Sequence, residues 1–145
     1  MTNAGSTGAR TRARELLVQA LYQMQLAGHS SSELLEQFHL QAAYQRVDQE
    51  FFDEALPLII KSQGDLELTI AELIDRPLDQ LDPVERAVLL IGIFELQSRI
   101  DVPYRVVINE GVNLAKRFGA LDGHKYINAC LDAAAKSLRS TEISG

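Results

Sequence analysis

The chain has 145 residues, of which 46% are hydrophobic and 23% are charged, so it has the size and composition of one globular domain. These values exclude a collagen-like repeat and a disordered tail protein, and no apolar run approaches the roughly 20 residues that span a bilayer, so we expect a soluble, cytoplasmic protein. The net charge of −6 is uneven, with a basic start followed by eleven acidic and three basic residues over 31–80. This pattern is unusual for a lone nucleic-acid binder, so a role with RNA or DNA would need a local basic patch or a basic partner.

The first nine residues are small or polar apart from Met1, and we expect residues 1–9 to form a flexible tail in front of one helical domain over residues 10–140. A first helix is predicted from Arg10, because apolar residues recur at helical spacing until Gly28, a natural stop. These apolar residues are Leu17, Ala20, Leu21 and Met24.

A second helix is predicted after Ser30, which forms a capping box with Glu33 and is followed by Leu34, Leu35 and Phe38. A third is predicted between Asp48 and Gln63 from the stripe Phe52, Ala55, Leu56 and Ile59. Pro57 lies inside this stripe and is expected to kink or split the helix, which Gly64 ends. A short fourth helix with Leu66, Ile70 and Leu73 closes before Pro77.

The clearest helix start lies at Asp82, whose side chain can cap the backbone amides, with Pro83 in the first position and Glu85 completing a capping-box-like arrangement. Residues 87–94 are apolar on every side, which is typical of a buried helix. A strand is the alternative for such a run, but about 16 residues before the charged Arg99 favour a helix on length.

A sixth helix is predicted from Pro103 with Val107, Ile108, Val112 and Ala115 inward, and Lys116 and Arg117 in its last turn oppose the negative end of its dipole. Gly119 is expected to supply a left-handed cap, and the side chain of Asp122 to cap a seventh helix. The stripe of that helix is Ile127, Cys130, Leu131, Ala134 and Leu138. About seven helices without a hairpin signal predict a compact, all-α bundle.

Little in the sequence points to catalysis or to a metal. The fingerprints GxGxxG, GxxxxGK[ST], HExxH and GxSxG are all missing, so we expect a protein that is not an enzyme and needs no cofactor. The single Cys130, with only His29, His39 and His124 beside it, excludes an intramolecular disulfide and a Cys/His zinc cluster. Cys130 is interpreted as a small core residue.

Two stretches are candidates for binding. Arg10, Arg12 and Arg14 place positive charge at a helix start, where it opposes the dipole, so contact with phosphates is as good an interpretation as a solvated helix start. Asp122 and Tyr126, with His124 and Lys125 between them, put amides and an aromatic ring at the start of the last helix, although a cap and a solvated turn explain them as well. Tyr22 lies just off the apolar stripe and either edges the core or faces a partner.

Several ordered blocks of the sequence resemble the NusB family of bacterial transcription antitermination factors. They extend from residue 9 to about residue 138, and only residues 27–77 match poorly. The blocks are residues 9–15, 18–23, 81–89, 102–110, 114–119 and 124–128.

The resemblance implies an all-helical fold of two packed subdomains and a non-enzymatic role. It implies that the chain binds the boxA element of ribosomal RNA as a heterodimer with the ribosomal protein NusE, joins other Nus factors on RNA polymerase, and assists transcript maturation. By the same resemblance, Arg10, Arg12, Arg14, Asp122 and Tyr126 lie on the RNA side. Tyr22 and Glu85 match residues that face NusE.

The sequence also departs from the family. Thr11 interrupts what is often a continuous arginine run, Leu90 stands where many relatives have arginine, and Gly111 and Ala129 replace commoner residues. Two alternatives stay open. One is the NusB-like domain of a ribosomal RNA cytosine methyltransferase, against which the lack of a module for S-adenosylmethionine argues, and the other is a helical scaffold that binds only protein.

Overall fold

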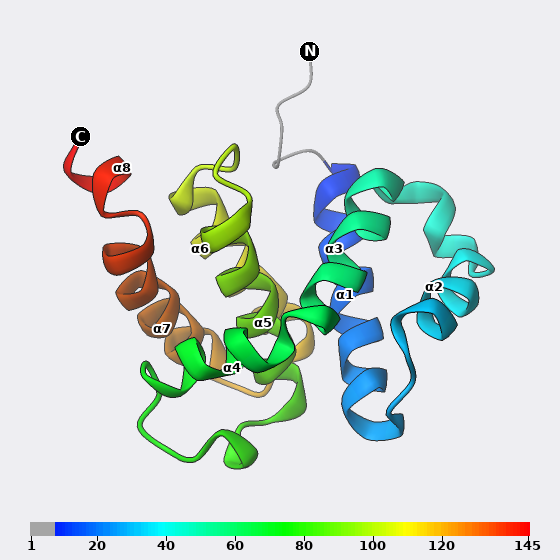
Figure 1. The fold of residues 1–145 in the computed structure, drawn as a ribbon, viewed down its shortest axis with the longest axis horizontal. Helices are drawn as coiled ribbons and strands as arrows, with labels where there is room; N and C mark the ends of the chain where they lie inside the picture. The colour runs from blue at the N-terminus through cyan, green and yellow to red at the C-terminus, as the bar shows by residue number, and fades with distance from the viewer. Residues whose placement is uncertain (1–7) are drawn as a thin grey trace.

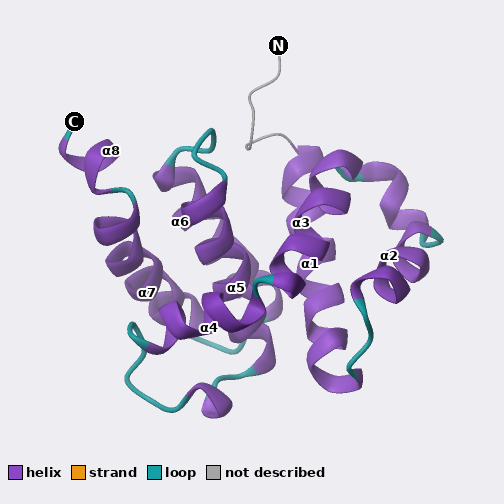
Figure 2. Ribbon diagram, in the orientation of Figure 1, coloured by secondary structure: helices purple, strands orange, loops and turns teal. Residues whose placement is uncertain are grey.

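The computed structural model describes residues 8–145, and over this range the chain is helical and contains no strand (Figures 1 and 2). This confirms the predicted all-α class. The helices are α1 (Gly8–Ala27), α2 (Ser31–His39), α3 (Gln49–Lys61), α4 (Gln63–Ala71), α5 (Pro83–Ser98), α6 (Tyr104–Phe118), α7 (Gly123–Leu138) and α8 (Ser140–Ser144), with 3-10 turns η1 (Ala42–Arg46) and η2 (Leu78–Gln80). Helix α1 starts two residues before the predicted Arg10, and the rest of the predicted tail, residues 1–7, lies outside the described residues.

The helices form two packed groups, which we call the N-terminal subdomain (α1 to α3) and the C-terminal subdomain (α4 to α8). Figure 1 shows the first group on the right and the second on the left, and α1 and α5 pack against each other where the two groups meet. Helix α5 is the centre of the core, because every residue from Ala87 to Leu96 is buried. The apolar run is therefore a buried helix, and the strand alternative is wrong.

Helices α5, α6 and α7 approach one another closely around the side chain of Leu131. A Cβ atom added to Gly92 on α5 would lie 2.6 Å from Leu131 Cδ2, and one added to Gly111 on α6 would lie 2.6 Å from Leu131 Cδ1. Real Cβ atoms do not come this close to a carbon, so a side chain at either position would require Leu131 to shift within the core.

Several predicted helix ends are confirmed. Helix α1 stops at Gly28, whose φ of +71° is the left-handed conformation that glycine tolerates best. Ser30 and Glu33 make the full capping box at the start of α2. Asp82 Oδ1 accepts a hydrogen bond from the amide of Val84 at 2.7 Å, with Pro83 as the first residue of α5.

The third helix is not split at Pro57, and the prediction that Gly64 ends it is wrong. Helix α3 continues through Pro57 and ends at Lys61, while Gly64 lies inside α4 instead of ending a helix. The missing N–H of a proline removes one hydrogen bond of the helix. Burial of Leu56 and Ile59 on either side of Pro57 holds the backbone helical and outweighs this loss.

The connection between α6 and α7 also differs from expectation. Gly119 has extended backbone angles (φ −91°, ψ 179°), and Asp122 is the left-handed residue, with φ +67°. The Asp122 side chain caps no amide of α7, because the left-handed backbone turns it toward Lys125, whose Nζ lies 3.5 Å from Oδ1. Glycine is still required at 119, since a Cβ there would lie 2.7 Å from the carbonyl oxygen of Ala115.

Arg139, the residue after α7, closes the C-terminal end of α5. Its buried guanidinium donates hydrogen bonds to carbonyl oxygens at the end of α5 and just beyond it. These are the oxygens of Leu96 at 2.7 Å, Val102 at 3.0 Å, Glu95 at 3.1 Å and Arg99 at 3.0 Å. A cation at this position adds hydrogen bonds to carbonyl oxygens at the helix end and meets the negative end of the dipole, although the oxygens of Glu95 and Arg99 also accept from the amides of Arg99 and Val102.

Candidate nucleic-acid and partner interface

The three arginines at the start of α1 have different surroundings. Arg14 is fully buried. Its guanidinium donates to both carboxylate oxygens of Glu95, at 2.7 and 2.8 Å, and to Glu110 Oε1 at 3.1 Å. Burial lowers the pKa of Arg14, but its hydrogen bonds to the two glutamates and their charges outweigh this effect and raise it overall.

The buried position of Arg14 argues against the prediction that it contacts RNA. A guanidinium with no exposed surface, already held by two carboxylates, has no face to offer to a phosphate. We therefore remove Arg14 from the RNA-contacting set.

Arg10 also has a structural contact. Its side chain is only 12% exposed, and Nε lies 2.8 Å from Asp48 Oδ2. The guanidinium carbon lies 4.4 Å from the centre of the Phe51 ring, a cation–π distance. Arg10 thus ties α1 to α3 and offers little surface to a ligand.

Arg12 is exposed and lies at the edge of a groove in which cations predominate. Two further arginines, Arg46 from η1 and Arg117 from the end of α6, border the same groove, and both are exposed. Glu15 pairs with Arg117 at 3.4 Å. The groove, which we call the basic groove, is lined by Arg12, Glu15, Leu16, Gln19, Ala43, Arg46, Val47 and Arg117.

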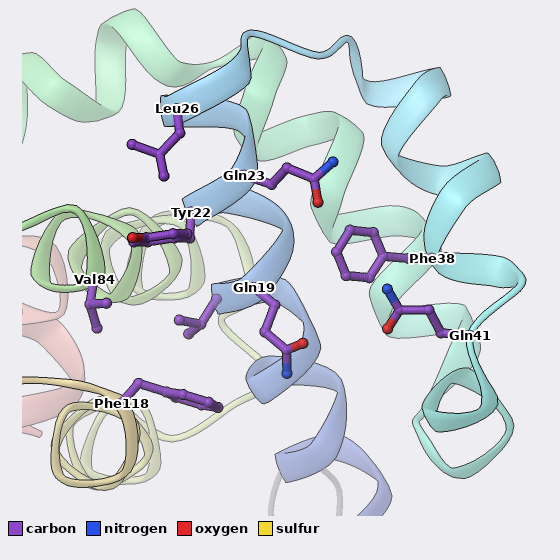
Figure 3. Close-up of a pocket in the computed structure, with 9 residues that line it drawn as sticks. Gln19, Tyr22, Gln23, Leu26, Phe38, Gln41, Val84 and Phe118 are labelled. Atoms are coloured by element: carbon purple, nitrogen blue, oxygen red, sulfur yellow. The ribbon is translucent and has the colours of Figure 1, made fainter.

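A second groove continues from the first along α1, and Gln19 borders both. We call it the aromatic groove; it is lined by Val18, Gln19, Tyr22, Gln23, Leu26, Phe38, Gln41, Val84 and Phe118. Figure 3 shows Tyr22, Val84 and Phe118 on one side of α1 and Phe38 with Gln41 on the other. Tyr22 is 41% exposed, so of the two interpretations of this residue the structure favours a surface position over the core.

The structure brings the other three candidate residues together. Glu85 on α5 lies beside the start of α7, because a Cβ on Gly123 would be 3.0 Å from Glu85 Oε2. Asp122 precedes this glycine, and Tyr126 follows one turn later. Asp82 and Asp75 add negative charge near Glu85 and Tyr126 respectively. We call Asp75, Asp82, Glu85 and Asp122 the acidic patch.

Glu85 is a half-buried acid among other acids. Its burial and the nearby charge of Asp82 raise its pKa above the ordinary glutamate value, although Arg76 and the Asp82 amide act in the opposite direction. Among residues 8–145, no cation forms an ion pair with this carboxylate, and Arg76 acts on it only through its charge. It is suited to pair with a cation that arrives from outside.

The ring of Tyr126 already has a cation on it. The guanidinium carbon of Arg76 lies 4.4 Å from the ring centre, and the tyrosine hydroxyl donates to Asp75 Oδ1 at 3.4 Å. A base that stacks at this point therefore meets the outer face of Arg76 or displaces it.

Other site classes find no support in the described part of the chain. Over residues 8–145, no group of three or more His, Cys, Asp or Glu side chains could hold a metal ion. None of the helices in this range combines the length and the apolar character needed to cross a bilayer. Cys130 is buried in the core, as predicted.

Comparison with known proteins identifies the family. The NusB family model matches residues 11–136. The chain belongs to the NusB family. The proteins named transcription antitermination protein NusB from Paraburkholderia phymatum and Alcanivorax borkumensis are 48% and 44% identical to it, over 134 and 144 residues respectively. The alignments cover 92% of both chains in the first case, and 99% of this chain and 96% of the relative in the second.

A solved NusB structure from T. maritima has the same fold, with a TM-score of 0.76, 25% identity and 94% of each chain covered. The relatives from P. phymatum and A. borkumensis are covered over 92% and 96% of their own length and bear the NusB name, so the match does not favour the methyltransferase alternative.

Three surface cations of this NusB chain were missed as site residues by sequence reasoning. Arg117 was interpreted only through the helix dipole, and Arg46 and Arg76 lie in the stretch that resembles the family least. Of these three arginines, only Arg117 could have been singled out from the sequence. Lys116 and Arg117 place two positive charges in the last turn of one helix, which is more than the helix dipole alone explains.

Proposed function

We propose that this protein is a non-enzymatic transcription antitermination factor of the cytoplasm. It binds the boxA RNA of ribosomal RNA operons as a heterodimer with NusE, within the antitermination complex of RNA polymerase and other Nus factors, and supports transcription and maturation of ribosomal RNA. Its NusB family membership supports this role, since its relatives bear the name transcription antitermination protein.

The basic groove is the observation that carries RNA binding. Arg12, Arg46 and Arg117 come from three separate elements and surround one groove in a chain whose net charge is −6. Guanidinium groups bind phosphates through paired hydrogen bonds. Three guanidinium groups around one groove can contact successive phosphates of a single strand that lies in it, which cations spread over a flat surface do less well.

Asp122 and Tyr126 supply the second part of the RNA surface. An unpaired base stacks on Arg76, which already lies on the Tyr126 ring. The exposed carboxylate of Asp122 repels phosphate and so limits which nucleotides approach.

The partner surface combines the aromatic groove with Asp82 and Glu85, the two members of the acidic patch at the start of α5. Val84 borders the groove, and its neighbour Glu85 belongs to the patch, so apolar and negative surfaces meet at the start of α5. A basic protein with an apolar anchor fits both, with Tyr22 packing against the anchor and Glu85 pairing with a cation.

The test is fluorescence anisotropy with labelled boxA RNA and a scrambled control, each with and without NusE. A preference for boxA that appears or sharpens when NusE is added supports the proposal. Equal binding of the two RNAs by the complex at physiological salt contradicts it and favours the scaffold that binds only protein.

A further inference from the structure

The buried ion pairs of Arg14 connect the two subdomains. Arg14 belongs to α1, Glu95 to α5 and Glu110 to α6. The hydroxyl of Thr11, one turn before Arg14, also donates to Glu110 Oε1 at 3.1 Å. The first turns of α1 are therefore tied to α6 at two points and to α5 at one.

The basic groove spans the same boundary. Arg12 and Arg46 come from the N-terminal subdomain, whereas Arg117 comes from α6 in the C-terminal one. Arg117 lies seven residues after Glu110 on the same helix, which is about 10 Å along its axis. The distance between the groove's cations thus depends on how α1 sits against α6.

Stability alone does not explain why charged groups occupy this place. Removing ions from water costs several kcal/mol for each ion, and well-packed apolar side chains often stabilise a core as much or more. What the ion pairs add is direction, because the planar guanidinium meets Glu95 through two parallel hydrogen bonds that permit one orientation.

We infer that Arg14 is a positioning residue for RNA binding: held by Glu95 and Glu110, it fixes the two subdomains so that Arg12, Arg46 and Arg117 fit one RNA backbone. This inference rests on the proposed function. Arg14 itself contacts no RNA.

The first test separates positioning from contact through the salt dependence of affinity. We compare the wild type with Arg14→Lys and with the triple variant Arg14→Met/Glu95→Leu/Glu110→Gln, which leaves no charge buried alone. Binding of labelled boxA RNA in the presence of NusE is measured over a range of salt, at a temperature where circular dichroism shows each variant fully helical.

Both variants are expected to bind at least about five-fold more weakly than the wild type. Their slope of log affinity against log salt stays at the wild-type value, because no phosphate contact is lost. The contact control Arg12→Gln lowers that slope by about 0.7. A reduced slope in the Arg14 variants, or an unchanged affinity, overturns the inference.

A second measurement does not depend on RNA. Spin labels on Glu36→Cys in α2 and Ala133→Cys in α7, both exposed, report the distance between the subdomains in a Cys130→Ala background. The distance distribution is expected to broaden in Arg14→Lys and in the triple variant, and equally narrow distributions overturn the inference. A wild type that lacks boxA preference refutes the proposed function instead, while this measurement still decides whether Arg14 fixes the subdomains.

Discussion

Arg10 and Asp48 join the first turns of α1 and α3. Arg10 Nε lies 2.8 Å from Asp48 Oδ2, while Oδ1 of the same carboxylate accepts the Phe51 amide at 3.0 Å and so caps α3. The backbone adds a third link, because the Asp48 amide donates to the carbonyl oxygen of Ala9 at 2.9 Å. One aspartate thus serves as helix cap, ion-pair partner and anchor for the start of α1.

This arrangement predicts loss of stability in acid through Asp48. Burial raises the pKa of Asp48, but the hydrogen bonds from Arg10 and Phe51 and the charges of Arg10 and Arg99 outweigh it, so the folded pKa lies below the ordinary value. The ionised carboxylate therefore stabilises the fold above about pH 4, and this contribution is lost as the pH falls through the lower folded pKa.

Asp48→Asn keeps a capping oxygen but removes the charge, so it is expected to cost about 1–2 kcal/mol at pH 7 and close to nothing at pH 2. Urea unfolding at several pH values measures this difference. The matched control is Asp132→Asn, which loses only an exposed pair with Lys136 at 3.5 Å and is expected to cost less than about 0.5 kcal/mol. A pH-independent loss in Asp48→Asn would speak against the ion pair.

The basic groove predicts which arginines control RNA affinity. Arg46→Gln and Arg117→Gln are each expected to weaken binding of authentic and scrambled RNA alike and to lower the log–log salt slope by about 0.7. Anisotropy titrations from low to physiological salt measure both effects. The control is Arg105→Gln, an exposed arginine outside the groove whose side chain contacts Tyr104. If Arg105→Gln changes the slope as much as the other two, the groove is not the binding site.

The aromatic groove predicts that partner binding depends on Tyr22. Tyr22→Ala is expected to weaken NusE binding by about 2 kcal/mol, because an aromatic ring in a groove is the typical anchor of an interface. It should lower the free energy of unfolding less than truncation of a core ring does, since Tyr22 is 41% exposed. Leu40→Ala, at a position 84% exposed and outside the groove, serves as control. Calorimetry that finds equal losses for both variants would exclude the groove as the docking surface.

Glu85 is predicted to favour partner binding at the expense of stability. Burial and the charge of Asp82 raise the folded pKa of Glu85. Protonated Glu85 therefore contributes to the stability of the fold below the ordinary glutamate pKa, and this contribution is lost as the pH rises through the folded pKa. Glu85→Gln should therefore raise the melting temperature at pH 7, with a smaller gain at pH 4, and weaken NusE binding at pH 7. Lower thermal stability of Glu85→Gln at pH 7 would contradict this account.

Substitution of two glycines by alanine is expected to have opposite effects, because Gly92 packs against Leu131 and Gly64 faces open space. Gly92→Ala places a methyl group against Leu131 and is expected to destabilise the fold by about 1–3 kcal/mol. Gly64→Ala, within α4 and with no atom within 4 Å of the new Cβ, is expected to stabilise it by about 0.5–1 kcal/mol. Urea unfolding of both variants provides the comparison, and a stabilising Gly92→Ala would show that α5 and α7 can separate without cost.

Local signals in the sequence were sufficient for most of the fold. The caps at Ser30 and Asp82 and the left-handed Gly28 work through bonds within a few residues, so their effects can be read from neighbours in the chain. The continuity of α3 through Pro57 could not, because it depends on burial against distant helices. The same holds for Asp122, whose left-handed backbone follows from how α6 and α7 meet.

The candidate site was predicted less well, since charge in a sequence does not say where a side chain points. One signal for Arg14 was present: it lies three residues before Leu17 and seven before Leu21, on the buried stripe of α1. Glu95, the one charged residue in the buried run 87–96 of α5, is the matching anion. Opposite charges on two apolar helix surfaces indicate a buried ion pair. Arg46 and Arg117, in contrast, border the same groove only because of the tertiary fold, so their sequence positions do not reveal it.

The hydrogen bonds of Arg139 have a consequence for synthesis of the chain. The last carbonyl oxygens of the central helix α5 accept hydrogen bonds from Arg139, which lies 44 residues after Glu95 in the sequence. During translation this helix leaves the ribosome well before the arginine that completes it, so its final turn stays frayed until α7 has emerged. The end of α5 is therefore completed only after residue 139 has been made, and a ribosome that stalls within α7 would leave this helix end without its arginine.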